Sequence, residues 1–142
     1  MVTLKNKIAI GCLVQWYEIK IVEEYIQSIR NALELVDNVE HIILDFVLVI
    51  NQDLEKINNQ MTMEEVETKF MSLLPVTARI NYKITDELYT IADYRRNFND
   101  KYCEEVDVLM WGETDSLIPS QTFEILDNLH TYDAFVYPNI WE

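Results

Sequence analysis

The sequence predicts an α/β fold in which a mostly parallel β-sheet carries helices on both faces, and three observations support this prediction. Short apolar runs alternate along the chain with segments whose apolar residues recur at helical spacing. One run, residues 45–50, is continuously apolar after Asp45, which is typical of a parallel strand covered on both faces. Strands that alternate with helices form parallel sheets with right-handed crossovers.

The first half of the chain predicts two strands and two helices. Residues 7–14 (KIAIGCLV) form a short apolar run, which indicates a buried strand. A helix is expected next, because apolar residues recur at helical spacing at Ile19, Val22, Ile26, Ile29, Leu33 and Val36. The second strand, residues 45–50, ends at the polar cluster 51–53. Thr62 and Glu65 then fit a capping box at the start of a helix that runs to about Leu74, before Pro75.

The second half continues the alternation. Residues 79–84 alternate polar and apolar side chains and predict a strand. Residues 87–103 predict a helix whose apolar stripe is Leu88, Ile91, Tyr94, Phe98 and Tyr102. An apolar strand follows at residues 106–112, then a helix from Pro119 to about Leu129, and a last strand at residues 134–137.

Length and composition limit the class of protein. The chain has 142 residues, which we expect to form one domain over residues 1–142, incomplete at its C-terminus because it stops just after a strand. The formal net charge of -14 argues against binding to nucleic acid or to an anionic membrane surface. A phosphate ligand would therefore need a metal ion or a local basic cluster.

The two cysteines, Cys12 and Cys103, show no metal-ligand spacing and are expected to be free thiols in a reducing compartment. The chain shows no stretch with the length of a signal-peptide core or a membrane span. We therefore expect a cytoplasmic protein without a transmembrane segment.

The strand at residues 106–112 ends in two carboxylates, Glu113 and Asp115. Two negative charges at the end of a buried strand are costly unless a cation or a hydrogen-bond network holds them. Ligands of open α/β sheets bind just beyond the carboxyl ends of the strands, where this pair would lie. A divalent cation that carries a phosphate would satisfy both carboxylates.

The order of these motifs resembles the donor-binding part of a GT-A glycosyltransferase, the family-2-like kind that uses nucleotide-diphosphate sugars. Residues 13–17 and the helix at 22–29 (VEEYIQSI) are similar to the family's first turn and helix. Residues 49–53 (VINQD) are similar to its acidic cluster near the nucleoside, and 95–99 (RRNFN) to its Ala-Arg-Asn-x-Gly segment. Residues 113–115 (ETD) are similar to its Asp-x-Asp motif. The chain departs from the family pattern at Val14, Tyr17, Asn99 and Glu113.

The resemblance implies a Rossmann-like (GT-A type) sheet, a Mg²⁺ or Mn²⁺ cofactor, a nucleotide-diphosphate sugar as donor and an acceptor that the sequence does not identify. Asp115 would coordinate the metal, and Glu113 would bind it through water or contact the ribose or sugar. Diphosphate or nucleoside contacts would come from Tyr17, Asn51, Asp53, Arg95, Arg96 and Asn97. No residue is assigned as the catalytic base.

Other interpretations of the same residues stay open. Glu113 and Asp115 could form an ordinary polar turn after Gly112, and Arg95 and Arg96 could pair with surface carboxylates. The domain could then be a non-catalytic α/β binding module that keeps the scaffold. A nucleotidyltransferase is disfavoured, because its glycine-rich phosphate loop does not fit a chain with two glycines.

Overall fold

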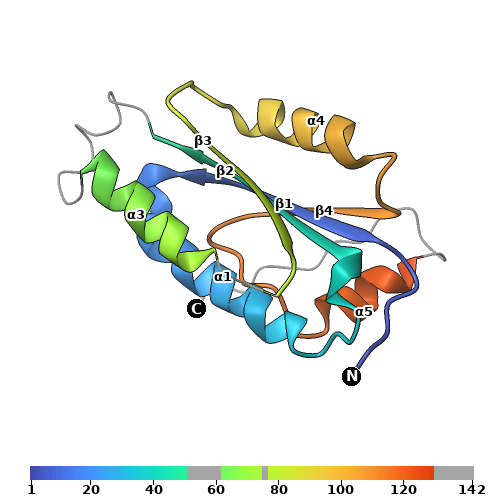
Figure 1. Ribbon diagram of the computed structural model, residues 1–142. Helices are drawn as coiled ribbons and strands as arrows, with labels where there is room; N and C mark the ends of the chain where they lie inside the picture. Colours follow the sequence, from blue (N-terminus) through green and yellow to red (C-terminus); the bar gives the residue numbers. More distant parts are fainter. Residues whose placement is uncertain (51–61, 75–76, 130–142) are drawn as a thin grey trace.

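The computed structural model describes residues 1–50, 62–74 and 77–129 and has at its centre a four-stranded, all-parallel sheet (Figure 1). The strands lie in the order β3-β2-β1-β4. Their bounds are Ile8–Gln15 for β1, Ile42–Val49 for β2, Arg79–Thr85 for β3 and Val108–Gly112 for β4. The predicted α/β fold with a parallel sheet is confirmed.

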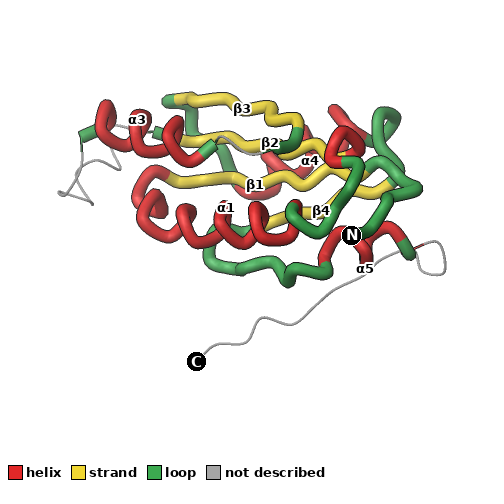
Figure 2. The backbone as a smooth tube through the Cα atoms, turned by 60° about the horizontal axis from the view of Figure 1, so that its bottom comes forward, coloured by secondary structure: helices red, strands yellow, loops and turns green. Residues whose placement is uncertain are grey.

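Helices cover both faces of this sheet, as the sequence predicted (Figure 2). The helices α1 (Ile19–Leu33), α3 (Met63–Leu73) and α5 (Thr122–Asp127) pack on one face. On the other face lies α4 (Ile91–Tyr102). Two short 3₁₀ helices, η1 (Trp16–Glu18) and η2 (Val39–His41), precede α1 and β2.

The two faces of the sheet form two apolar clusters, because successive side chains of a strand point to opposite sides. Ile10 and Cys12 of β1 pack with α1, whereas Ala9 and Leu13 pack with α4. In β2 every residue is buried, as expected for a central parallel strand. Asp45 is the exception to its apolar character, because this carboxylate points to the α4 face at 6% exposure.

Threonine side chains cap the first turns of two helices, α3 and α4. The capping box predicted for Thr62 and Glu65 is present, with both reciprocal hydrogen bonds at the start of α3. The helix predicted from residue 87 begins later, at Ile91, because Thr90 Oγ1 accepts the backbone N–H of Asp93 at 3.0 Å. Residues 87–90 therefore form a connection rather than a first helical turn, and α5 is likewise shorter than predicted.

The direction in which strands are added reverses once in this topology. From β1 the chain adds β2 and then β3 on one side, with α1 between β1 and β2. It then passes through α4 and adds β4 on the other side of β1. The carboxyl ends of β1 and β4 thus flank a topological switch point, the place where open α/β sheets bind their ligands.

Some predictions fall on residues outside the described parts of the chain: the strand at 134–137 and the candidate residues Asn51 and Asp53. The helix predicted to run to about Leu74 is confirmed, because α3 ends at Leu73. Within the described ranges, no helix combines the length and the apolar character that crossing a membrane would require.

Candidate functional site

The segments that follow β1 and β4 meet at the switch point. Thr114, in the turn after β4, donates its hydroxyl hydrogen to Oε2 of Glu18, the last residue of η1 after β1. The other carboxylate oxygen of Glu18 accepts the backbone N–H of Gln15 at 2.9 Å. Thr114 is buried at 3% exposure, while its neighbours Glu113 and Asp115 are exposed. The bond therefore holds the two acidic neighbours at the rim of this edge.

Three carboxylates share this rim. Burial raises the pKa of the Cys12 thiol on β1, and the negative charges of Glu18, Glu113 and Asp115 raise it further. The hydrogen bond between Glu18 and Thr114 brings these three residues to the same edge of the sheet, because Glu113 and Asp115 are the sequence neighbours of Thr114. Glu18 was not among the residues predicted from the sequence, although Gln15 and Glu18 have the spacing of a capping box that could have indicated its position.

Arg95 reaches the same rim from α4, which lies on the face of the sheet opposite α1. Its Nη2 lies 3.1 Å from Oε1 of Glu113, and the guanidinium lies over the indole ring of Trp111, 4.7 Å from the ring centroid. Trp111 is held in turn, because its Nε1–H donates to Oδ1 of Asn99 at 3.0 Å. Neither Trp111 nor Asn99 was expected to support the site.

The other predicted residues lie in different surroundings. Arg96 points to the exposed side of α4 and pairs with Asp93 at 3.6 Å, with 69% of its side chain exposed. The structure thus brings Arg95 and Glu113 together and leaves Arg96 in the surface pairing that was the alternative interpretation. Asn97 donates to the hydroxyl of Tyr89 at 3.0 Å. Tyr17 lies in η1 beside Glu18 with 48% exposure.

The donors at this edge suit an open cation site rather than a closed cage. Among the described residues, no group of three or more histidine, cysteine, aspartate or glutamate side chains has the geometry of a metal centre. Mg²⁺ in nucleotide sites uses only one or two protein carboxylates, together with water and substrate phosphates. The exposed carboxylates of Glu113 and Asp115 fit such an open site, in which water and substrate phosphates supply the other ligands.

Comparison of the chain with models of known protein families, with curated proteins and with solved structures found no match.

Proposed function

We propose that this domain binds a nucleotide-diphosphate sugar together with Mg²⁺ or Mn²⁺ at the carboxyl ends of β1 and β4, and that it is the donor-binding part of a glycosyltransferase. One observation carries the proposal: acidic side chains from both sides of the topological switch point, Glu18 after β1 and Glu113 and Asp115 after β4, gather with Arg95 at one rim. Open α/β sheets bind ligands at this position.

Charge explains why a cation is needed. The formal net charge is -14, so a free diphosphate would be repelled by the domain and by the carboxylates at the rim. In the proposed site Asp115 and Glu113 would hold the cation, which would supply positive charge to stabilise a departing diphosphate. Arg95 contributes a guanidinium that suits phosphate oxygens.

The nucleoside would lie beside η1. Tyr17 presents a half-exposed phenol ring next to Glu18, and we propose that it stacks on the base. Asn51 and Asp53, which follow β2, are proposed nucleoside contacts on the family resemblance alone. The acceptor and the base that deprotonates it stay unassigned. A cytoplasmic location stays a proposal that rests on the sequence.

A non-catalytic binding module is the second candidate. The ion pair between Arg95 and Glu113 favours it, because Arg95 already neutralises one of the two carboxylates that would hold the metal. Such a module would bind the nucleotide without transferring a sugar, so ligand binding tests the site and sugar turnover separates the two candidates.

Thermal unfolding with UDP or GDP, with and without Mn²⁺, tests the proposal. At a free ligand concentration of about 100 times Kd, binding should add about 2.7 kcal/mol and raise the Tm by roughly 5–10 °C. The increase should need both nucleotide and Mn²⁺ and should vanish in Asp115→Ala. It should persist in Asp100→Ala, which removes an exposed carboxylate on α4. No increase with any nucleotide and metal pair would overturn the proposal.

A further inference from the structure

One row of residues runs across all four strands beneath α4. The strand registers pair Trp111 of β4 with Gly11 of β1, Gly11 with Asp45 of β2, and Asp45 with Asn81 of β3. In a parallel sheet, residues in register point to the same face. These four residues form what we call the α4 seat, and each of them meets a side chain of α4.

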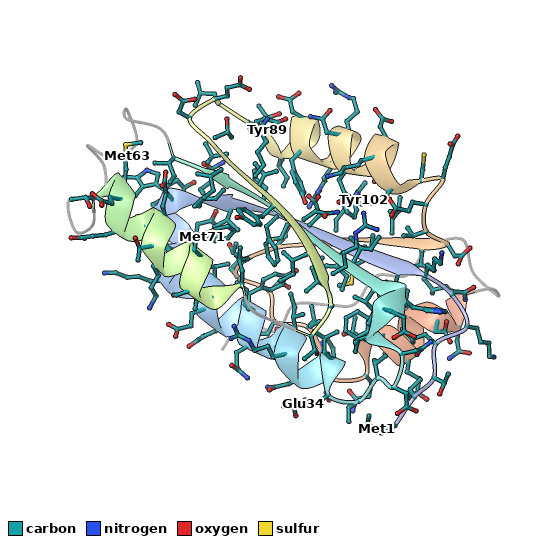
Figure 3. The ribbon with its side chains drawn as sticks, viewed as in Figure 1. Met1, Glu34, Met63, Met71, Tyr89 and Tyr102 are labelled. Atoms are coloured by element: carbon teal, nitrogen blue, oxygen red, sulfur yellow. The ribbon has the colours of Figure 1, made fainter. Side chains whose placement is uncertain are left out.

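Contacts between α4 and the seat are mostly polar. Trp111 receives Arg95 over its ring and donates to Asn99. At the far end, the amide of Asn81 donates to the hydroxyl of Tyr102 at 2.7 Å. Figure 3 labels Tyr102 at the end of α4, where the side chains of the helix meet the sheet. The seat thus joins β3 at one edge of the sheet to the Arg95–Glu113 pair at the other.

Asp45 receives most of these hydrogen bonds. Its carboxylate accepts the hydroxyls of Tyr94 at 2.8 Å and Tyr102 at 2.7 Å, and Lys101 Nζ lies 3.5 Å away. Tyr94 and Tyr102 are about two helical turns apart, roughly 12 Å along the axis, so two side chains converge on one carboxylate from opposite directions. This arrangement resists sliding of the helix in either direction.

Gly11 provides the space for this approach. A Cβ atom at Gly11 would lie 2.6 Å from the hydroxyl of Tyr94 and 2.6 Å from a ring carbon of Phe98. The absence of a side chain there lets the Tyr94 ring pass over β1 to reach Asp45 on β2. In the parts of the chain that the structure describes, α4 is the one helix on this face, and it rests there on the seat and on apolar side chains of β1 and β2.

An apolar side chain at position 45 would also hold a helix, and it would not require a carboxylate to leave water. Apolar contacts are non-directional, however, and permit a helix to shift. A buried acid with two hydroxyl donors defines one position. An apolar residue at position 45 would thus keep α4 on the sheet, whereas the hydrogen-bonded carboxylate also fixes the position of Arg95.

We infer that Asp45 is a positioning residue: acting through Tyr94 and Tyr102, it fixes where α4 lies on the sheet and so holds Arg95 over Trp111 and beside Glu113. The inference rests on the proposed function, because the position of Arg95 matters for the ligand only if the switch point binds a diphosphate.

The test begins with the ligand-free protein. In ¹⁵N-resolved NMR spectra, the indole N–H of Trp111 and the Nε–H of Arg95 are identified with Trp111→Phe and Arg95→Lys. Asp45→Asn, which keeps the shape and removes the charge, should shift or broaden both signals. Asp127→Asn is the matched control: Asp127 is a second buried carboxylate, at 4% exposure, but it accepts the backbone N–H groups of Lys5 and Asn6 near the opposite ends of the strands. That variant should leave both signals in place.

The second measurement is the Kd for UDP or GDP in the presence of Mn²⁺. Asp45→Asn should weaken binding by about fivefold or more, and Asp127→Asn by less than about twofold. Should Asp45→Asn fail to fold, Tyr102→Phe removes one of the two hydroxyl donors while keeping the ring and should shift the same signals in the same direction.

The outcomes separate the two claims. Unmoved Trp111 and Arg95 signals in folded Asp45→Asn, or in Tyr102→Phe, would overturn the positioning role whatever the nucleotide does. Shifted signals in a protein whose wild type binds no nucleotide with Mn²⁺ would overturn the proposed function and leave the role of Asp45 in placing α4 intact. Equal effects of Asp45→Asn and Asp127→Asn on the two signals would show that Asp45 acts only through general stability.

Discussion

The hydroxyl of Thr114 donates a hydrogen bond to the carboxylate of Glu18, and this bond joins the segment after β4 to the segment after β1. The two residues are 96 positions apart in the sequence. Because both strands end at the same edge of the sheet, the bond ties the two segments together at the switch point. Thr114 is thus a buried anchor, and Glu113 and Asp115 are its neighbours in the sequence.

Removing that anchor should loosen the rim. Thr114→Val keeps the shape and removes the hydroxyl, so Glu18 loses a charge-assisted bond worth about 1.5–3 kcal/mol. We expect the free energy of unfolding in urea to fall by about that amount and Mn²⁺-dependent nucleotide binding to weaken. Thr122→Val removes a buried hydroxyl that donates to the carbonyl of Pro119 in the loop before α5. It should cost about 0.5–1.5 kcal/mol and leave ligand binding unchanged; equal ligand effects in the two variants would contradict the role of Thr114.

The two arginines of α4 should differ in their effect on binding. Arg95→Ala removes the group that pairs with Glu113, and we expect Kd for the Mn²⁺–nucleotide complex to rise at least about tenfold, equivalent to about 1.4 kcal/mol. Arg96→Ala removes an exposed i,i+3 partner of Asp93 and should change Kd by less than about twofold. Isothermal titration calorimetry measures both, and a larger loss in Arg96→Ala would show that the ligand approaches from the outer side of α4.

Gly11→Ala should weaken the packing of α4 on the sheet. The added methyl group would lie 2.6 Å from the Tyr94 hydroxyl and meet the ring of Phe98, so both side chains must move from a packed layer. Overpacking of this kind costs about 1–3 kcal/mol. Urea unfolding measures the loss, and a variant as stable as the wild type would mean that α4 can lift from the sheet at little cost.

Stability should fall at alkaline pH, because burial raises the pKa of Tyr94, and the Asp45 charge and hydrogen bond raise it further. The folded protein keeps this proton while the unfolded chain releases it above pH of about 10, so the stabilisation is complete below that pH and is lost as pH rises beyond it. Buried Cys12 acts in the same direction, with its pKa also raised. Urea unfolding at pH 9 to 11 should show a decline that is smaller in Tyr94→Phe by about 1.4 kcal/mol over this whole range. An unchanged slope would contradict the buried, protonated state of Tyr94.

Local patterns in the sequence were enough to predict the elements. The buried runs of β1 and β2, the capping box at Thr62 and the apolar stripe of Tyr94, Phe98 and Tyr102 are all short-range features, and each appears in the structure. The start of α4 was placed too early because the sequence 87–90 continues the helical spacing, whereas the hydroxyl of Thr90 caps the helix and sets its first residue.

The long-range partners could not be predicted in the same way. Periodicity shows which face a residue occupies, but the pairing of Arg95 with Glu113, and not of Arg96, depends on the rotation of α4 about its axis. That rotation is set by contacts with Asp45 and Trp111, which are distant in sequence. Glu18 was missed for the same reason, since its contact with Thr114 exists only once β4 has added beside β1.

Mn²⁺ itself gives the most direct test of the proposed site, because the paramagnetic ion broadens the NMR signals of nearby amides. With nucleotide present, we expect selective broadening at Glu18 and at Gly112 through Ser116, while Lys5 and Asn6, close to the amino ends of the strands, stay sharp. Broadening centred on Lys5 and Asn6, or spread evenly over the acidic surface, would contradict a cation site at the carboxyl ends of β1 and β4.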